Sequence, residues 1–170
     1  MSLGRTLAEQ RREVPDATFF LWEGRAFSYV DADRRVDNVV RGLIACGVRP
    51  GERVAVLMAG RPSYLSAVTA LSRLGAVAVL LSPDERRVSV ARALARVEVQ
   101  YIVCDPENVA RAKEALPGAR RSRRVLVLGG GGEQRALDRH HRHGAIDPSP
   151  GGGARKWYRP QPWAAPRTWR

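Results

Sequence analysis

Lysine is almost missing from this 170-residue sequence: Lys113 and Lys156 are two of its 29 basic residues, and the others are arginines. A net charge of +12 ordinarily favours an anionic partner such as nucleic acid. An arginine excess also follows from a G+C-rich coding sequence, because most arginine codons are rich in G and C. The charge alone therefore does not predict a nucleic-acid partner.

Cysteine and long apolar runs are also scarce. Cys46 and Cys104 lie far apart, and neither has a second thiol nearby in the sequence for a metal site. We expect both to be buried free thiols in a reducing cytosol. No apolar run approaches the ~18 residues of a membrane span, and the first residues contain no hydrophobic signal region. The sequence therefore predicts a soluble, cytoplasmic protein.

The first 47 residues predict a helix, a hairpin and a second helix. Apolar spacing indicates a short helix that ends before Pro15. Residues 18–29 read as two strands joined at Glu23-Gly24, where glycine supplies a positive φ. Ser28 then opens a helix with a capping box, and Gly47 closes it. The apolar stripe expected on this helix consists of Val36, Val39, Val40, Leu43 and Ile44.

From residue 53 the pattern alternates between apolar strands and amphipathic helices. Strands that are apolar throughout, separated by helices, indicate parallel strands covered on both faces. The predicted fold class is therefore α/β: a layered, mostly parallel sheet flanked by helices, with an N-terminal hairpin and a disordered C-terminal tail. The expected strands are 53–58, 76–81, 99–104 and 124–129, and the expected helices are 62–75, 84–97 and 105–116.

A set of short motifs occurs in a specific order along residues 16–128. The set comprises Gly24-Arg25, Ser28-Tyr29, Gly47-Val48, Pro50-Gly51-Glu52-Arg53-Val54-Ala55, Gly75-Ala76-Val77 and Leu80-Leu81-Ser82-Pro83. In order and spacing it resembles the N-terminal region of the AMP-dependent synthetase and ligase family, the adenylate-forming acyl-CoA synthetases. Leu80, Ser82 and Ala59-Gly60 depart from the usual family residues, which loosens any subfamily assignment.

The resemblance implies ATP, Mg²⁺ and coenzyme A as cofactors of the intact family, and a fatty acid or other carboxylate as its substrate. That chemistry needs a Ser/Thr/Gly-rich loop ending in lysine and a second, mobile lysine near the carboxylate. Neither motif is found in this sequence. The glycine runs at 129–136 and 151–157 lack the hydroxyl residue or the strand-to-helix context of a phosphate loop. We therefore assign no catalytic, cofactor-binding or metal-binding residue to this chain, and expect it to bind none of these cofactors alone.

Residues 129–170 differ in composition from residues 1–128, which we take as the synthetase-like portion. Half of the glycines and five of the eleven prolines fall in this tail, and we expect it to be disordered. Its composition is also what a shifted reading frame of G+C-rich DNA yields, so a frameshift near 129–137 would explain it. His140, His141 and His143 lack paired ligand spacing and do not predict a metal site.

The functional prediction is a fragment of an ATP-dependent carboxylate–CoA ligase that is inactive alone. The alternative is a small basic α/β module that binds nucleic acid by charge and stacking. Its candidate residues are Arg120, Arg121, Arg123, Arg124, Trp157, Tyr158, Trp163 and Trp169. A third possibility is a subunit that a second chain completes by supplying the missing catalytic half.

Overall fold

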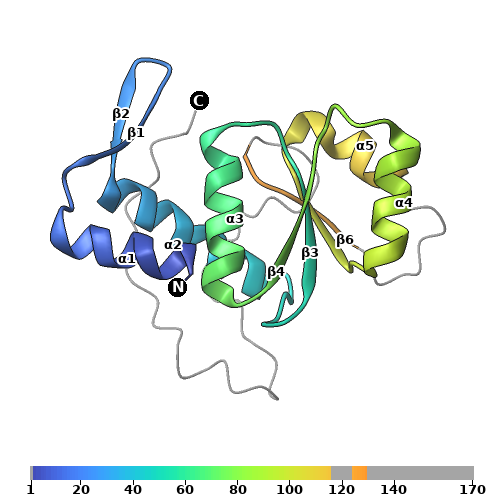
Figure 1. Cartoon of the computed structure of the whole chain (residues 1–170), viewed down its shortest axis with the longest axis horizontal. Coiled ribbons are helices and arrows are strands. Elements are labelled where there is room, and N and C mark those ends of the chain that lie inside the picture. Colours follow the sequence, from blue (N-terminus) through green and yellow to red (C-terminus); the bar gives the residue numbers. More distant parts are fainter. Residues whose placement is uncertain (1, 116–123, 130–170) are drawn as a thin grey trace.

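The computed structural model describes residues 2–115 and 124–129 (Figure 1). The predictions made for the histidines and glycine runs beyond residue 129 lie outside this part of the chain. The elements, in order, are α1 (Leu3–Glu13), β1 (Thr18–Trp22), β2 (Arg25–Ser28), α2 (Tyr29–Ala45), β3 (Arg53–Leu57), α3 (Pro62–Leu74), β4 (Val77–Leu81), α4 (Arg87–Val97), β5 (Tyr101–Cys104), the 3-10 helix η1 (Pro106–Asn108), α5 (Val109–Glu114) and β6 (Arg124–Val127).

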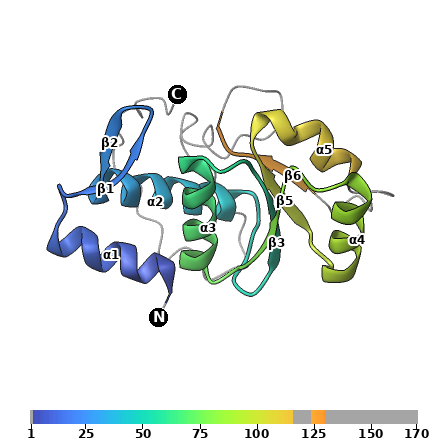
Figure 2. The ribbon, with the colours of Figure 1, turned by 45° about the horizontal axis from the view of Figure 1, so that its top comes forward.

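Four of the strands form one parallel sheet in the order β4-β3-β5-β6. The chain passes from β3 through α3 to β4, and then returns past β3 through α4 to β5. Helices cover both faces of this sheet (Figures 1 and 2). The prediction of a layered α/β fold with a parallel sheet is therefore confirmed.

Alternate residues of β3 belong to two separate cores, as the two-residue period of a strand requires. Val54 and Val56 pack with residues of α1, α2 and α3. Ala55 and Leu57 pack with residues of α4 and α5. All four side chains are fully buried, so β3 is the centre of the molecule.

The N-terminal hairpin is also confirmed. Strands β1 and β2 pair antiparallel, and Glu23 and Gly24 join them with φ angles of 48° and 73°. Two consecutive positive φ angles match the strand twist of a two-residue hairpin. The rings of Phe20 and Phe27 stack across the two strands with centroids 4.8 Å apart. The hairpin extends from the helical end of the molecule, away from the parallel sheet (Figure 1).

Both predicted ends of α2 are present. The Ser28 side chain accepts a hydrogen bond from the Asp31 N–H, and the Asp31 carboxylate accepts one from the Ser28 N–H. At the other end Gly47 has a φ of 93°, and the next N–H, that of Val48, donates to the Leu43 carbonyl at 3.0 Å. One member of the predicted apolar stripe is wrong: Ile44 is 45% exposed, because it lies on the outer side of the last turn.

Several predicted boundaries are corrected by the structure, two of them because of local hydrogen bonds. The helix expected at 105–116 is divided into η1 and α5, because the Asp105 side chain accepts from the Asn108 N–H and closes a tight turn first. The helix expected at 84–97 starts only at Arg87, since residues 82–85 form a turn. The strand expected at 99–104 starts at Tyr101.

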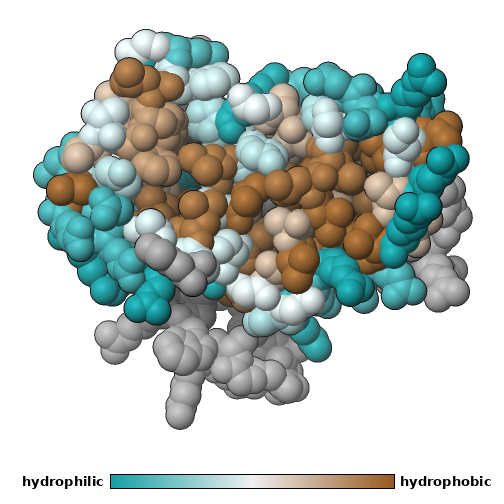
Figure 3. All heavy atoms as spheres, viewed as in Figure 1, coloured by the Kyte–Doolittle hydropathy of each residue, from teal (hydrophilic) through white to brown (hydrophobic). Residues whose placement is uncertain are grey.

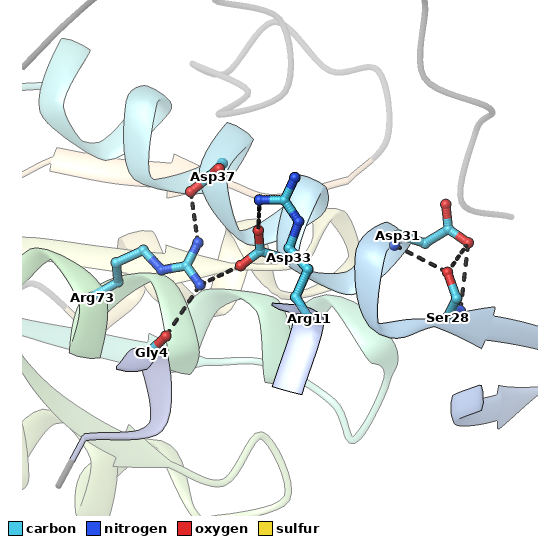
Figure 4. Close-up of polar contacts among 7 residues, drawn as sticks. All are labelled: Gly4, Arg11, Ser28, Asp31, Asp33, Asp37 and Arg73. Atoms are coloured by element: carbon cyan, nitrogen blue, oxygen red, sulfur yellow. Dashed lines mark hydrogen bonds and ion pairs between the residues drawn. The ribbon is translucent and has the colours of Figure 1, made fainter. Parts of the chain in front are cut away.

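An ionic cluster around the buried carboxylate of Asp33 links α1 and α2 to α3 (Figure 4). The Asp33 carboxylate, only 3% exposed, accepts hydrogen bonds from Arg11 at 2.9 Å and from Arg73 at 2.5 Å. Arg73 also bonds Asp37 at 2.6 Å and the carbonyl of Gly4 at 3.2 Å. A Cβ at Gly4 would lie 2.8 Å from the Arg73 Cβ, so only glycine permits this approach. The cluster is structural and lies away from the carboxyl ends of the sheet strands.

Candidate functional site

The carboxyl ends of the parallel strands are where the fold brings polar groups together. The chain leaves β3 toward α3 on one face of the sheet, and leaves the neighbouring strands β4 and β5 toward α4 and α5 on the other. Open α/β sheets bind ligands in the crevice created where the connections diverge in this way. The loops after β3, β4 and β5 are therefore the candidate site.

Asp105 fixes the loops after β3 and β5 to each other. Its carboxylate, in a residue only 2% exposed, accepts a hydrogen bond from the Ala59 N–H at 2.8 Å. It also accepts from the Asn108 N–H at 3.2 Å and from the Asn108 side-chain amide at 2.6 Å. A carboxylate with this many donors positions backbone rather than a substrate. Asp105 is the first residue of the helix predicted at 105–116, but nothing in the sequence indicates its bond to Ala59, 46 residues away.

An exposed ion pair joins the same two loops, those after β3 and β5. The Arg61 guanidinium donates to the Glu107 carboxylate at 2.9 Å, and the two side chains are 46% and 58% exposed. The N–H of Glu107 itself and then Arg61 hold the pKa of the Glu107 carboxyl below its usual range. The Glu107 carboxylate in turn raises the pKa of Arg61. Arg61 lies at the start of α3, but its charge is matched by Glu107.

Between β3 and β4 the surface is hollowed over about 400 Å³. The hollow is open, and its polar side chains are those of Tyr64, Ser82 and Asp84. The Ser82 hydroxyl accepts from the Asp84 N–H at 3.2 Å, which orders the turn after β4. The lining residues are Met58, Ala59, Gly60, Tyr64, Leu80, Leu81, Ser82, Pro83 and Asp84. Its lining thus combines apolar side chains with two hydroxyl groups and one carboxylate, and it includes no basic side chain.

The predicted free thiols are confirmed as buried. Cys104 ends β5 directly beside Asp105. Burial, and secondly the charge of Asp105, raise the pKa of the Cys104 thiol to about 12. A thiol that remains protonated near neutral pH is a packing residue rather than a nucleophile.

ATP and Mg²⁺ do not fit the residues at this site. A triphosphate needs basic side chains or a glycine-rich loop, but the charged group lining the hollow is the Asp84 carboxylate, which repels phosphate. Lys113, the single lysine of the described ranges, is exposed on α5 and does not line the hollow. Within residues 2–115 and 124–129 no three carboxylate, histidine or cysteine side chains gather as a metal site would require.

The residues named for the nucleic-acid alternative lie almost wholly outside the described ranges. Arg124 is the first residue of β6, whereas the others belong to the two undescribed segments. This alternative therefore stays a prediction. None of the described helices is long and apolar enough to cross a bilayer.

Solved structures with the same architecture are adenylate-forming enzymes. MbtA from Mycobacterium smegmatis superposes with a TM-score of 0.74 at 25% identity, over 85% of this chain and 28% of that one. A benzoate CoA ligase from Burkholderia xenovorans superposes with a TM-score of 0.67 at 16% identity, over 75% of this chain and 26% of that one. These likenesses agree with the α/β fold described above.

Curated relatives carry similar names. The chain is 32% identical over 137 residues to triostin synthetase I of Streptomyces triostinicus, covering 80% of this chain and 26% of that protein. It is 36% identical over 106 residues to a feruloyl-CoA synthase of an Amycolatopsis species, covering 62% of this chain and 22% of that protein. The chain thus spans about a quarter of the length of these relatives.

The model of one protein family matches residues 7–164, which is most of the chain. That interval includes every motif on which the sequence resemblance depends, and it continues into the tail after residue 128, whose origin stays a prediction. The family is described as AMP-binding enzyme. The chain therefore belongs to the AMP-binding enzyme family.

Proposed function

We propose that this chain is the N-terminal portion of an ATP-dependent carboxylate–CoA ligase, and that alone it forms neither an acyl-adenylate nor an acyl-CoA. The observation that carries the proposal is the family match over residues 7–164, combined with the small share of each relative that the chain spans. The intact enzyme would activate a fatty acid or another carboxylate, as the names of relatives such as feruloyl-CoA synthase suggest. ATP and CoA are cytoplasmic cofactors, so a cytoplasmic location is part of the proposal.

The role of this portion is to provide a scaffold. Its carboxyl-end loops are held by Asp105 and by the Arg61–Glu107 pair, and these side chains are already satisfied by protein partners. The described loops therefore offer shape and backbone to a neighbouring part of the enzyme. The phosphate-binding lysine and glycine loop would come from that neighbouring part, on the same polypeptide or on a second chain.

Pyrophosphate release tests the proposal. Purified chain is incubated with ATP, Mg²⁺, CoA and a panel of carboxylic acids that includes ferulate, benzoate and medium- and long-chain fatty acids. We expect release no greater than that of heat-denatured chain. The Amycolatopsis feruloyl-CoA synthase in the same buffer is the positive control. Turnover with any acid that exceeds the denatured control and disappears without ATP would overturn the proposal.

A further inference from the structure

Helix α1 buries little of its own surface. Of its 11 residues, two are buried, Gly4 and Leu7. The Leu7 side chain enters the core that α2, α3 and the sheet form, whereas Leu3 is 44% exposed. Most of the surface over α1 is hydrophilic, while the hydrophobic band in the same view lies over α3 and β4 (Figure 3). A helix of this length is marginal by itself in water, so α1 depends on its docking against α2 and α3.

Polar contacts of α1 with its neighbours gather around the carboxylate of Asp33 (Figure 4). The Arg11 side chain is 49% exposed, and its guanidinium donates to Asp33 at 2.9 Å. At the other end of α1, the Gly4 carbonyl accepts from Arg73 at 3.2 Å. Docking of α1 therefore combines one buried leucine with two hydrogen bonds, one of which is made by a half-exposed arginine.

The charges around Asp33 remain paired when α1 is taken away. Arg73 of α3 donates to both Asp33 and Asp37, and these two acceptors lie on α2. If α1 leaves, Asp33 exchanges the Arg11 guanidinium for water but retains Arg73, and Arg73 loses the Gly4 carbonyl. Breaking a buried ion pair is costly when it leaves a charge without a partner, and here no such charge is left. The interface between α1 and the rest can therefore open without an uncompensated buried charge.

Val14 is the residue about which α1 can turn. Directly after it, the Pro15 carbonyl accepts from the Val30 N–H at 3.0 Å, and the Ala17 carbonyl accepts from the Tyr29 N–H at 3.1 Å. These two bonds fix the chain after α1 to the first turn of α2. Val14 itself is 41% exposed and has left the helical conformation, with a φ of -137°. A hinge needs a few element-terminal residues whose backbone angles can change, so α1 can swing without disturbing α2.

We propose that α1 is a strap that opens about Val14 and uncovers the Asp33 side of α2 and α3, while α2, α3 and the parallel sheet stay folded. The closed state requires glycine at residue 4, because a Cβ there would lie 2.8 Å from the Cβ and 2.9 Å from the Cα of Arg73. Salt screens the half-exposed Arg11 guanidinium from Asp33, so rising ionic strength favours the open state. The inference is independent of the proposed function.

Amide hydrogen exchange of the complete chain, followed by mass spectrometry, tests the strap. Near neutral pH we expect the amides of residues 7–13 to exchange at least about tenfold faster than those of residues 36–45, because α1 opens without global unfolding. Raising NaCl from about 0.01 M to about 1 M should speed the exchange of residues 7–13 by about threefold or more, and leave that of residues 36–45 unaltered.

Two substitutions weaken the closed state in different ways. Gly4→Ala places a methyl group against the Arg73 backbone, and should speed the exchange of residues 7–13 by about tenfold or more. Alanine is the better helix former, so helix propensity alone would change exchange in the opposite direction. Arg11→Gln removes the charge that reaches Asp33, and should speed this exchange by about threefold to tenfold.

Arg5→Gln is the matched control for Arg11→Gln. It makes the same change of charge in the same helix, but Arg5 pairs with Glu9 one turn further along α1. Exchange of residues 7–13 should therefore change by no more than about twofold in this variant. Circular dichroism of each variant establishes that α2, α3 and the sheet still fold.

Equal exchange of residues 7–13 and 36–45 in the wild type would overturn the inference, because α1 would then open only together with the whole molecule. This comparison needs no substitution, so it decides the question even if Gly4→Ala fails to fold. A Gly4→Ala variant in which residues 7–13 exchange more slowly would also refute the strap. The same holds if Arg11→Gln has no larger effect than Arg5→Gln, or if it speeds residues 36–45 as much as residues 7–13.

Discussion

Strands β3 and β4 have nearly the same sequence character but opposite environments. Both are five-residue apolar strands, and they are paired to each other along their whole length. The last four side chains of β3 are fully buried, whereas Val77 and Leu80 of β4 are about half exposed. The comparison shows that an apolar run specifies a parallel strand, but that the neighbours of the strand determine its burial. The first experiments below perturb the covered centre and the open edge in parallel, and the last compares two contacts between the loops after β3 and β5.

Thiol reactivity should give the largest difference between the two environments. Cys104 lies in β5, next to β3, and its thiol has a pKa of about 12. A cysteine introduced by Leu80→Cys would be exposed, with an ordinary pKa near ~8.5. At a pH of about 8 the thiolate fraction of Cys104 is then lower by roughly a thousandfold, and alkylation should be slower by at least that factor.

Peptide mass spectrometry after timed exposure to iodoacetamide measures both rates in the same sample. Equal rates in concentrated urea are the control, because unfolding gives both thiols the same environment. Similar rates in the native protein would mean that the sheet opens on the time scale of alkylation, or that the β4 edge is covered in solution.

Truncation of a leucine in each strand should give the second-largest difference between β3 and β4, measured as a loss of unfolding free energy. Leu57→Ala removes a fully buried side chain at the end of β3, and should lower the free energy of unfolding by about 2–5 kcal/mol. Leu80→Ala removes a side chain that is half exposed, and should lower it by less than about 1 kcal/mol. Urea denaturation followed by circular dichroism measures both. A cost for Leu80→Ala equal to that of Leu57→Ala would contradict the exposure of β4.

The sequence predicted most of the fold because its local signals agree with one another. Apolar runs, helix caps and turn glycines predicted every strand of the sheet, the hairpin at Glu23-Gly24 and both ends of α2. The wrong details depend on a competing hydrogen bond in one case and on the width of the covered helix face in another. Asp105 caps a turn before the helix that follows it, and Ile44 has an apolar residue's spacing but lies beyond the edge of the covered stripe.

The candidate site was less predictable, because its contacts join residues far apart in the chain. The bond between Asp105 and the Ala59 N–H spans 46 residues and depends on the order of the strands, which a single sequence does not specify. The same limitation applies to the Asp33 cluster, whose arginines come from two different helices.

Removal of the Asp105 carboxylate should lower the free energy of unfolding moderately, because it weakens the contact between the loops after β3 and β5. Asp105→Ala leaves the partly buried Ala59 N–H and the Asn108 groups without their acceptor, and should cost about 1–3 kcal/mol of unfolding free energy. Ser82→Ala is the matched change on the open side. The Ser82 hydroxyl accepts one exposed hydrogen bond, so this variant should lose less than about 0.5 kcal/mol. Urea denaturation measures the loss of unfolding free energy for both variants. A larger loss for Ser82→Ala than for Asp105→Ala would mean that the turn after β4 is held more strongly than the loops that Asp105 joins.

The exposed pair of Arg61 and Glu107 should contribute least to the free energy of unfolding, although it joins the same loops as Asp105. Because the folded-state pKa of Glu107 is lowered, any stability from the pair is present above the unfolded carboxyl pKa and is lost as the pH falls through the folded value. Both side chains are about half exposed, so solvent screens the pair and Glu107→Gln should cost less than about 1 kcal/mol near pH ~7.

The difference between wild type and Glu107→Gln should therefore disappear in acid, and it should also shrink at high salt near neutral pH. Urea denaturation of both proteins at neutral and acidic pH measures it. A stability difference between the two proteins that grows on acidification would contradict a lowered pKa for the Glu107 carboxyl. A neutral-pH cost larger than that of Asp105→Ala would mean that the exposed pair, rather than the buried carboxylate, holds the loop after β3 against the loop after β5.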